Sequence, residues 1–240
     1  MRIIVRLDLK EKFVIKPIQF EGLRKIGNPK DLAKKYYNNG ADELILINVV
    51  SSLYDTKWIE KYVRTISREI FIPITVGGGI KNVTEALKFF KYGVDKIAIC
   101  SALFDNKNLL KDLSKEFGSQ SVVASIQANK IGNDWYAFKE MARVNTKKKV
   151  YDWIKECIDN GAGEILLTSV KHDGRMKGLD IEMFNEYCDI CSVPLIIAGG
   201  FNSTQNLKKL KKFPDAISAS SIFHFDKTTP KAIKDNFNYE

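Results

Sequence analysis

The chain repeats itself at about half its length. Each repeated segment is an apolar, β-branched run that ends in small or polar residues, which is typical of a strand buried on both faces and followed by a loop. Two copies of a four-strand unit predict eight strands in two half-barrels, about 1–120 and 121–240. The repeats pair DELILINVVSS (42–52) with GEILLTSVKH (163–172) and PITVGGGIKN (73–82) with PLIIAGGFNS (194–203), both at an offset of 121, and DKIAICSALF (95–104) with DAISASSIFH (215–224) at 120.

Helical stretches separate the predicted strands. Alternating strands and helices indicate parallel βαβ units, and eight of them in 240 residues fit one closed (β/α)8 TIM-barrel domain spanning 1–240. A doubly wound open sheet is the alternative, but a two-fold duplication closes naturally into a barrel. We expect strands near 2–8, 43–48, 72–76, 96–100, 121–127, 164–169, 194–198 and 215–220, and helices over 30–39, 57–69, 82–92, 106–117, 146–160, 180–191 and 203–212.

Composition excludes several classes of protein. No apolar run reaches membrane-spanning length, and the first strand starts at residue 2 with no room for a signal peptide, so we expect a cytoplasmic protein that binds no membrane. The net charge of +9 comes from lysines spread along helix faces, without the interleaved aromatic residues of a base-stacking platform. We therefore expect a lysine-rich surface with some attraction for phosphorylated substrates, and no nucleic-acid partner.

The four cysteines suggest no chemistry. Cys188 and Cys191 form a CxxC pair, but it lacks the second pair that a structural zinc site needs, and it does not open a helix after a strand as a redox pair would. We expect no metal and no cofactor.

The carboxyl ends of the predicted strands form one mouth of the barrel, where TIM barrels carry their chemistry. Two glycine runs follow strands three and seven, the same place in each half. Glycine lets a backbone approach an anion, and the next helix turn can donate N–H groups to it, so we expect a phosphate or similar anion at each end of the substrate. Tight turn packing is the structural alternative for either run. The candidate binding residues are Gly78, Gly79, Cys100, Ser101, Thr168, Gly199, Gly200, Ser220 and Ser221.

Asp8 and Gln127 are candidate catalytic residues. The internal alignment pairs them at an offset of 119, on opposite sides of the mouth and between the two anion sites. A general acid and a general base are expected in such a place. Only Asp8 can carry a proton, because the amide of Gln127 can only donate and accept hydrogen bonds.

Four charged residues stand at the opposite ends of the strands. Charges at the opening of a packed barrel are costly unless they are paired, so two positive and two negative side chains predict a closed ring of salt bridges. Such a ring could be a plug or a gate. Its members, the charged ring below, are Arg2, Glu43, Lys96 and Glu164.

With these residues located, the chain resembles the cyclase subunit family of imidazole glycerol phosphate synthase over essentially its whole length. The segments that carry the resemblance are RLDLK followed by Lys16 in VIKP, FEGLR, GADELILI, PITVGGGI, GVDKIAI, FGSQSVVASI, GAGEILLTSV with Asp173 and Gly174, and SSIFHF.

The resemblance implies a partner and a reaction. In that family a separate glutaminase subunit docks at the face of the charged ring and supplies ammonia, which crosses the barrel to a bis-phosphorylated substrate at the mouth. There the ammonia closes an imidazole ring and releases an aminoimidazole carboxamide ribotide. The resemblance places Lys16, Asp173 and Gly174 among the substrate-binding residues. We expect Asp95, beside Lys96, to lie in or next to the glutaminase interface.

The sequence also departs from the family pattern. Gln127 stands where the family has its second catalytic aspartate, and Asn48, Cys100 and Lys171 replace other polar residues of the site. Some relatives pass ammonia to nitrogen-bearing sugars of surface polysaccharides or nonulosonic acids, and the departures favour such a paralogue. The alternatives are the genuine cyclase of histidine biosynthesis, a non-catalytic scaffold for the glutaminase, and the related single-chain isomerase, which needs no ammonia.

Overall fold

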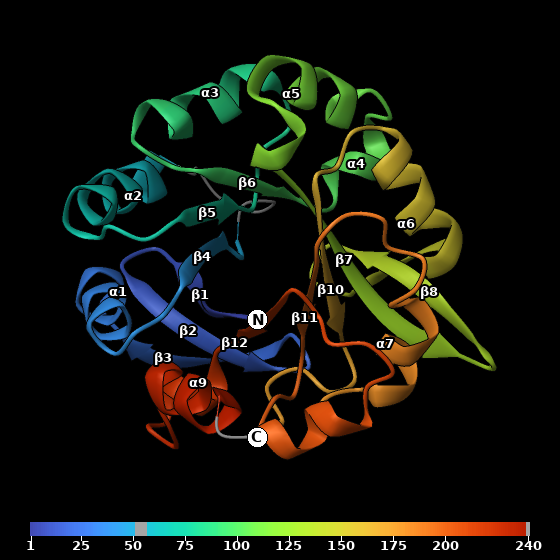
Figure 1. Ribbon diagram of the computed structural model, residues 1–240. Coiled ribbons are helices and arrows are strands. Elements are labelled where there is room, and N and C mark those ends of the chain that lie inside the picture. The colour runs from blue at the N-terminus through green and yellow to red at the C-terminus, as the bar shows by residue number, and fades with distance from the viewer. Residues whose placement is uncertain (51–56, 239–240) are drawn as a thin grey trace.

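Eight parallel strands pair side by side until the last meets the first, in a computed structural model that describes residues 1–50 and 57–238 (Figure 1). The pairing of β10 with β7 closes the circle, which confirms the TIM barrel and excludes an open sheet. The barrel strands, in spatial order, are β1 (Arg2–Lys10), β4 (Glu43–Asn48), β5 (Ile74–Gly77), β6 (Lys96–Ile99), β7 (Val122–Ile131), β10 (Glu164–Ser169), β11 (Leu195–Ala198) and β12 (Ala216–Ala219).

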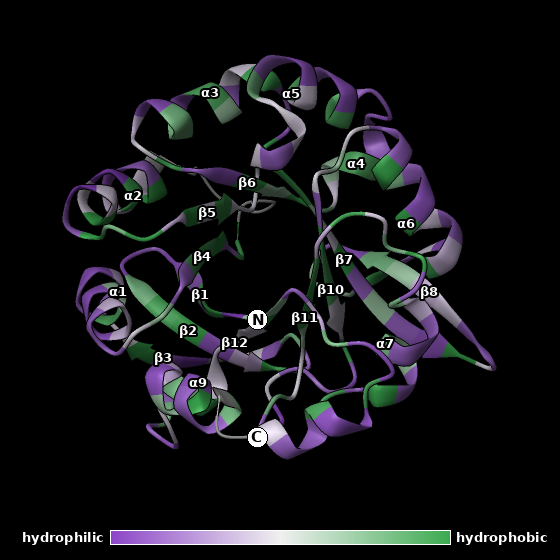
Figure 2. Ribbon diagram, viewed as in Figure 1, coloured by the Kyte–Doolittle hydropathy of each residue, from purple (hydrophilic) through white to green (hydrophobic). Residues whose placement is uncertain are grey.

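Helices surround the strands as an outer layer (Figure 1), and longer helices such as α3 and α6 carry both hydrophobic and hydrophilic residues (Figure 2). No helix among the described residues is long and apolar enough to cross a membrane. The elements are α1 (Pro29–Asn38), α2 (Lys57–Glu69), α3 (Val83–Lys91), α4 (Ala102–Asp105), α5 (Leu109–Phe117), η1 (Ser119–Ser121), α6 (Val150–Asp159), α7 (Ile181–Tyr187), η2 (Thr204–Lys209), α8 (Ser221–His224) and α9 (Pro230–Asn238).

One predicted helix was wrong in type. The stretch 203–212 forms only the short 3-10 helix η2, because Leu207 is its one buried residue and a single apolar anchor cannot hold an amphipathic α-helix against the barrel. The helix expected over 146–160 starts at Val150, since residues 144–149 pair with a neighbouring strand.

Two antiparallel hairpins were missing from the prediction. Each extends the first barrel strand of its half: β2 (Phe13–Ile18) and β3 (Glu21–Gly27) follow β1, while β8 (Asp134–Lys139) and β9 (Val144–Lys149) follow β7. The starts of β2 and β8 are 121 residues apart, so the duplication includes the hairpins as well. β9 (VNTKKK) has a single apolar residue and gives little signal, whereas β2 (FVIKPI) and β8 (DWYAFK) contain buried apolar residues that the prediction overlooked.

Apolar side chains fill both sides of the strands. The larger cluster lies between strands and helices, and a second cluster fills the inside of the barrel between the charged ring and the mouth. Because this second cluster carries no charge, it separates the two polar ends of the barrel. Its buried members are Ile4, Ile45, Ala98, Val123, Leu166, Ile196, Ala198 and Ala216.

Candidate functional site

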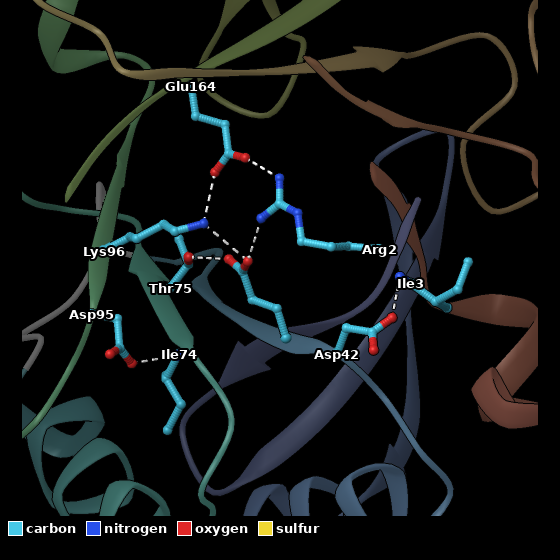
Figure 3. A network of polar contacts seen from close by, with 9 residues as sticks. Arg2, Ile3, Asp42, Ile74, Thr75, Asp95, Lys96 and Glu164 are labelled. Atoms are coloured by element: carbon cyan, nitrogen blue, oxygen red, sulfur yellow. Dashed lines mark hydrogen bonds and ion pairs between the residues drawn. The ribbon is translucent and has the colours of Figure 1, made fainter. Parts of the chain in front are cut away.

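The four members of the charged ring contact one another in a closed circuit (Figure 3). Arg2 donates through Nη1 to Glu43 at 2.9 Å and through Nη2 to Glu164. Lys96 Nζ contacts the same two carboxylates, at 3.0 Å to Glu43 and 2.9 Å to Glu164. The prediction of paired charges at this opening is therefore confirmed.

The ring has a fifth member that the sequence did not reveal. Thr75 donates from its hydroxyl to the remaining oxygen of Glu43 at 2.6 Å, so both oxygens of this fully buried carboxylate are satisfied. Arg2 is the most exposed member, at 34% of its side chain. A buried carboxylate is tolerated when both of its oxygens have partners, whereas the loss of one partner lowers the free energy of unfolding.

Asp95 lies beside the ring and caps a strand. Its carboxylate accepts the backbone N–H of Ile74 at 2.8 Å, in the way that Asp42 accepts that of Ile3 (Figure 3). Asp215, the counterpart of Asp95 in the second half, accepts the N–H of Leu195. These contacts give Asp95 a structural role, and its place in a partner interface stays a prediction.

Two cavities open at the mouth, and residues of both halves line each of them. The larger, of about 360 Å³, is lined by Gly78, Gly79, Cys100, Ser101 and Gln127 together with hairpin residues Glu140 and Met141. The smaller, of about 20 Å³, is lined by Lys16, Asp173, Gly174, Gly199, Gly200, Ser220 and Ser221. The duplicated glycine turns thus lie in equivalent cavities of very unequal size.

The glycine turns are also required by the backbone. Gly78 has a φ of +89°, and a Cβ there would lie 2.1 Å from the carbonyl oxygen of Asn48. At Gly200, with φ +84°, a Cβ would lie 2.3 Å from the carbonyl oxygen of Gly178. Packing alone therefore excludes other residues, which supports the structural alternative, while phosphate binding by these turns remains a prediction.

Asp8 contacts two cationic side chains. Arg6 Nε donates to its Oδ1 at 2.7 Å, and Lys16 Nζ lies 3.5 Å from its Oδ2. Lys16 in turn donates to both carboxylate oxygens of Asp173, at 3.1 and 3.2 Å. Burial alone would raise the pKa of Asp8, but Arg6 and Lys16 outweigh it and lower the pKa below the usual value. Asp8 is therefore an ionised carboxylate, 1% exposed, that lines neither cavity.

Gln127 holds the tip of the β8–β9 hairpin over the larger cavity. Its Oε1 accepts the backbone N–H of Ala142 at 2.7 Å, and the hydroxyl of Ser101 accepts that of Glu140 at 3.0 Å. Glu140, Met141 and Ala142 have φ values of +55°, +57° and +61°, a left-handed run that non-glycine residues adopt only when their surroundings impose it. Two predicted site residues, Gln127 and Ser101, thus hold the strained turn 140–142 over the larger cavity.

The remaining predicted residues differ in their access to a ligand. The Cys100 thiol donates to the carbonyl of Phe138 at 3.9 Å, and burial raises its pKa to about 12, so it is a neutral group. The Ser221 hydroxyl is buried in the smaller cavity with no hydrogen-bond partner among the described residues. Thr168 is fully buried and lines neither cavity.

The structure adds one residue at the centre of the mouth. Arg6 is 6% exposed and lines both cavities, yet it was not among the predicted site residues. A signal was present, because in RIIVRLDL the arginine stands two residues before Asp8 and therefore on the same face of the strand. Arg6 and Lys16 balance Asp8 and Asp173 in charge.

Cys188 and Cys191 follow α7 as free, buried thiols, and burial raises the pKa of both. The part of the chain that the structure describes contains no cluster of three histidine, cysteine or carboxylate side chains placed to hold a metal ion.

Comparisons with known proteins agree with this architecture. The model of a family described as "Histidine biosynthesis protein" matches residues 2–229. The imidazole glycerol phosphate synthase subunit HisF of Legionella pneumophila is 42% identical over 206 residues, which cover 85% of this chain and 97% of the relative. The HisF subunit of Streptococcus mutans is 36% identical over 242 residues (98% and 96%), and that of Petrotoga mobilis 37% over 236 (97% and 94%). The chain thus belongs to the histidine biosynthesis protein family, as a HisF-like enzyme subunit.

Proposed function

We propose that this protein is an ammonia-using synthase subunit, which receives ammonia from a glutaminase through the charged ring and adds it to a phosphorylated substrate at the mouth. One observation carries the proposal: the same barrel has a complete ring of ion pairs at one end and two duplicated, glycine-bordered cavities at the other. The names of the relatives support it, since each is a subunit of a synthase.

The apolar interior of the barrel favours neutral ammonia over the ammonium ion. Free ammonia is mostly protonated in neutral water, and only a dry conduit delivers the nucleophilic form. The apolar cluster above the ring, with Ile4, Ile45 and Leu166 fully buried, disfavours an ammonium ion by several kcal/mol or more. Opening the ring requires Arg2 or Lys96 to release a carboxylate, and Arg2 is the more exposed of the two.

For the acceptor, we propose a substrate other than the histidine-pathway ribotide, in a paralogue that makes nitrogen-bearing sugars. Gln127 supports this, because an amide that accepts the Ala142 N–H can orient an intermediate but cannot transfer a proton. The alternative is the imidazole glycerol phosphate synthase reaction itself, in histidine biosynthesis, which the names of the relatives favour. A non-catalytic scaffold is disfavoured by the buried Asp8–Lys16–Asp173 group, which scaffolding does not need.

The acceptor is tested with the histidine-pathway ribotide and ammonium chloride. We expect very slow turnover by the wild type and a faster rate for Gln127→Asp, since a general acid or base contributes about 10²–10⁴-fold. Gln127→Asn is the matched control, because it shortens the side chain equally without adding a titrating group. A wild-type rate of roughly 1 s⁻¹ or more would show that the protein is a genuine cyclase. Co-purification with a glutaminase from the same organism tests the partner, and a chain that never binds one would overturn channelling.

A further inference from the structure

Arg6 differs from the other arginine on the same strand face. Arg2 uses both of its terminal nitrogens, Nη1 and Nη2, to bind carboxylates. Arg6, four residues further along β1, makes its hydrogen bond to Asp8 through Nε. Among the described residues, neither Nη1 nor Nη2 of Arg6 has a hydrogen-bond partner, and its other contact is the ring of Phe20, 5.7 Å from the guanidinium carbon.

These nitrogens are donors that face the cavities and are available to a ligand. A ligand that buried them without supplying an acceptor would bind less well by about 1–3 kcal/mol, and by more because the group is charged. Arg6 is more than nine-tenths buried, and it borders both the cavity of about 360 Å³ and the one of about 20 Å³. Its unused nitrogens are therefore located between the two predicted phosphate sites.

We propose that Arg6 is a substrate-binding residue whose two terminal nitrogens hold an oxyanion, carboxylate or phosphoryl, in the middle of the ligand. A guanidinium presents paired N–H groups in a fixed fork, which matches two oxygens of such a group. Because Arg6 and Lys16 are already balanced by Asp8 and Asp173, recognition depends on these free N–H groups rather than on net positive charge.

This proposal rests on the proposed function and narrows its substrate. An acceptor with an uncharged centre would leave the Arg6 N–H groups buried and unpaired. A site with a built-in donor discriminates strongly against a ligand that lacks the matching acceptor. The acceptor therefore carries an anion in its centre as well as at its ends.

Isothermal titration calorimetry with two small probes, malonate and inorganic phosphate, tests Arg6. The variants are Arg6→Lys, which keeps a cation beside Asp8 but loses the fork, and Arg6→Gln. Arg64→Gln, on the exposed face of α2, removes the same charge far from the mouth as a control. We expect both Arg6 variants to weaken one probe about 10- to 100-fold, as expected for lost charge-assisted hydrogen bonds, and Arg64→Gln to bind like wild type.

The two probes separate the sources of the oxyanion. A loss confined to malonate identifies a carboxylate, and the loss of one phosphate equivalent identifies a phosphoryl group. Equal binding of both probes by wild type and the Arg6 variants, or no saturable binding of either, overturns the proposal. The double variant Ser101→Ala, Ser221→Ala tests the terminal phosphate sites separately. If that variant loses phosphate while the Arg6 variants do not, the proposed function stands and only the Arg6 assignment falls.

Discussion

The two ends of the barrel handle buried charge in opposite ways. At the ring end every carboxylate oxygen of Glu43 and Glu164 has a partner within the protein. At the mouth, Asp8 Oδ2 and the hydroxyls of Ser218 and Ser221 are buried without hydrogen bonds to described residues. The ring thus satisfies its buried charges within the protein, whereas the hydroxyls of Ser218 and Ser221 line the smaller cavity as groups that a ligand can use. Asp8 Oδ2 has its cation, Lys16 Nζ, 3.5 Å away.

This difference teaches how to separate stabilising residues from functional ones in a duplicated barrel. Substitutions at the ring should act mainly on the free energy of unfolding, and those at the mouth mainly on ligand binding and rate. The predictions below run from the largest expected effect to the smallest.

The largest effect is expected at Asp8. In the faster Gln127→Asp background, Asp8→Asn should reduce ammonia-dependent turnover about 10²–10⁴-fold, since an amide cannot exchange a proton. The steady-state rate with ammonium chloride measures this. A substantially retained rate would place Asp8 with the stabilising residues, as a mere counter-ion of Arg6 and Lys16.

Removal of one ring cation should cost stability. Lys96→Ala leaves Glu43 and Glu164 to share Arg2, and breaking a buried pair costs about 3 kcal/mol or more. Lys88→Ala is the control, because Lys88 is 54% exposed and 4.0 Å from Glu60; we expect its effect to stay within about 0.5 kcal/mol. Urea unfolding measures both, and similar midpoints would refute the view that the ring is a stabilising unit.

A pH-dependent effect is expected at His224, whose Nδ1 lies 2.7 Å from the hydroxyl of Tyr36. Burial, and then the charge of Lys16, lower the pKa of His224 to about 4. The unfolded chain takes up a proton below about pH 6.5 while the folded protein does not, so stability falls as pH drops from 6.5 towards 4. Between pH 7 and pH 5 this contributes a loss of about 2 kcal/mol.

His224→Gln should remove this part of the pH dependence, whereas His172→Gln, at the other histidine of the chain, should not. Urea unfolding at the two pH values gives the comparison. Identical pH dependence in wild type and His224→Gln would mean that the pKa of His224 is the same in the folded and unfolded states.

The smallest effect is expected at Asp95. Asp95→Ala removes the acceptor of the Ile74 N–H and should lower stability by about 1 kcal/mol, while Asp95→Asn keeps an acceptor oxygen and should lower it less. Thermal unfolding of the isolated subunit measures this, and glutaminase affinity measures the predicted interface role. A loss of affinity in both variants with unchanged stability would reverse the assignment.

The sequence predicts some parts of the structure well and others poorly. The barrel and the ring follow from strand periodicity, because residues such as Glu43 and Glu164 occupy equivalent strand starts in both halves. In the hairpins, β9 has no apolar face to recognise, whereas β2 and β8 carry buried apolar residues that the prediction did not assign to strands. For Arg6, its position two residues before Asp8 indicated the shared strand face, but only the structure shows which of its nitrogens have partners. The sizes of the cavities depend on long side chains that reach across the mouth, such as those of Lys16 and Met176.

The unequal sizes of the two cavities also affect the orientation in which a ligand binds. A perfectly two-fold mouth would accept a ligand with similar groups at both ends in either of two orientations, and under the proposed function half of the encounters would present the wrong end to ammonia. With one roomy and one nearly filled cavity, the two orientations are no longer degenerate. Divergence of the two halves has thus turned a symmetric receptacle into one that distinguishes head from tail, which a duplicated gene cannot do at the moment of its duplication.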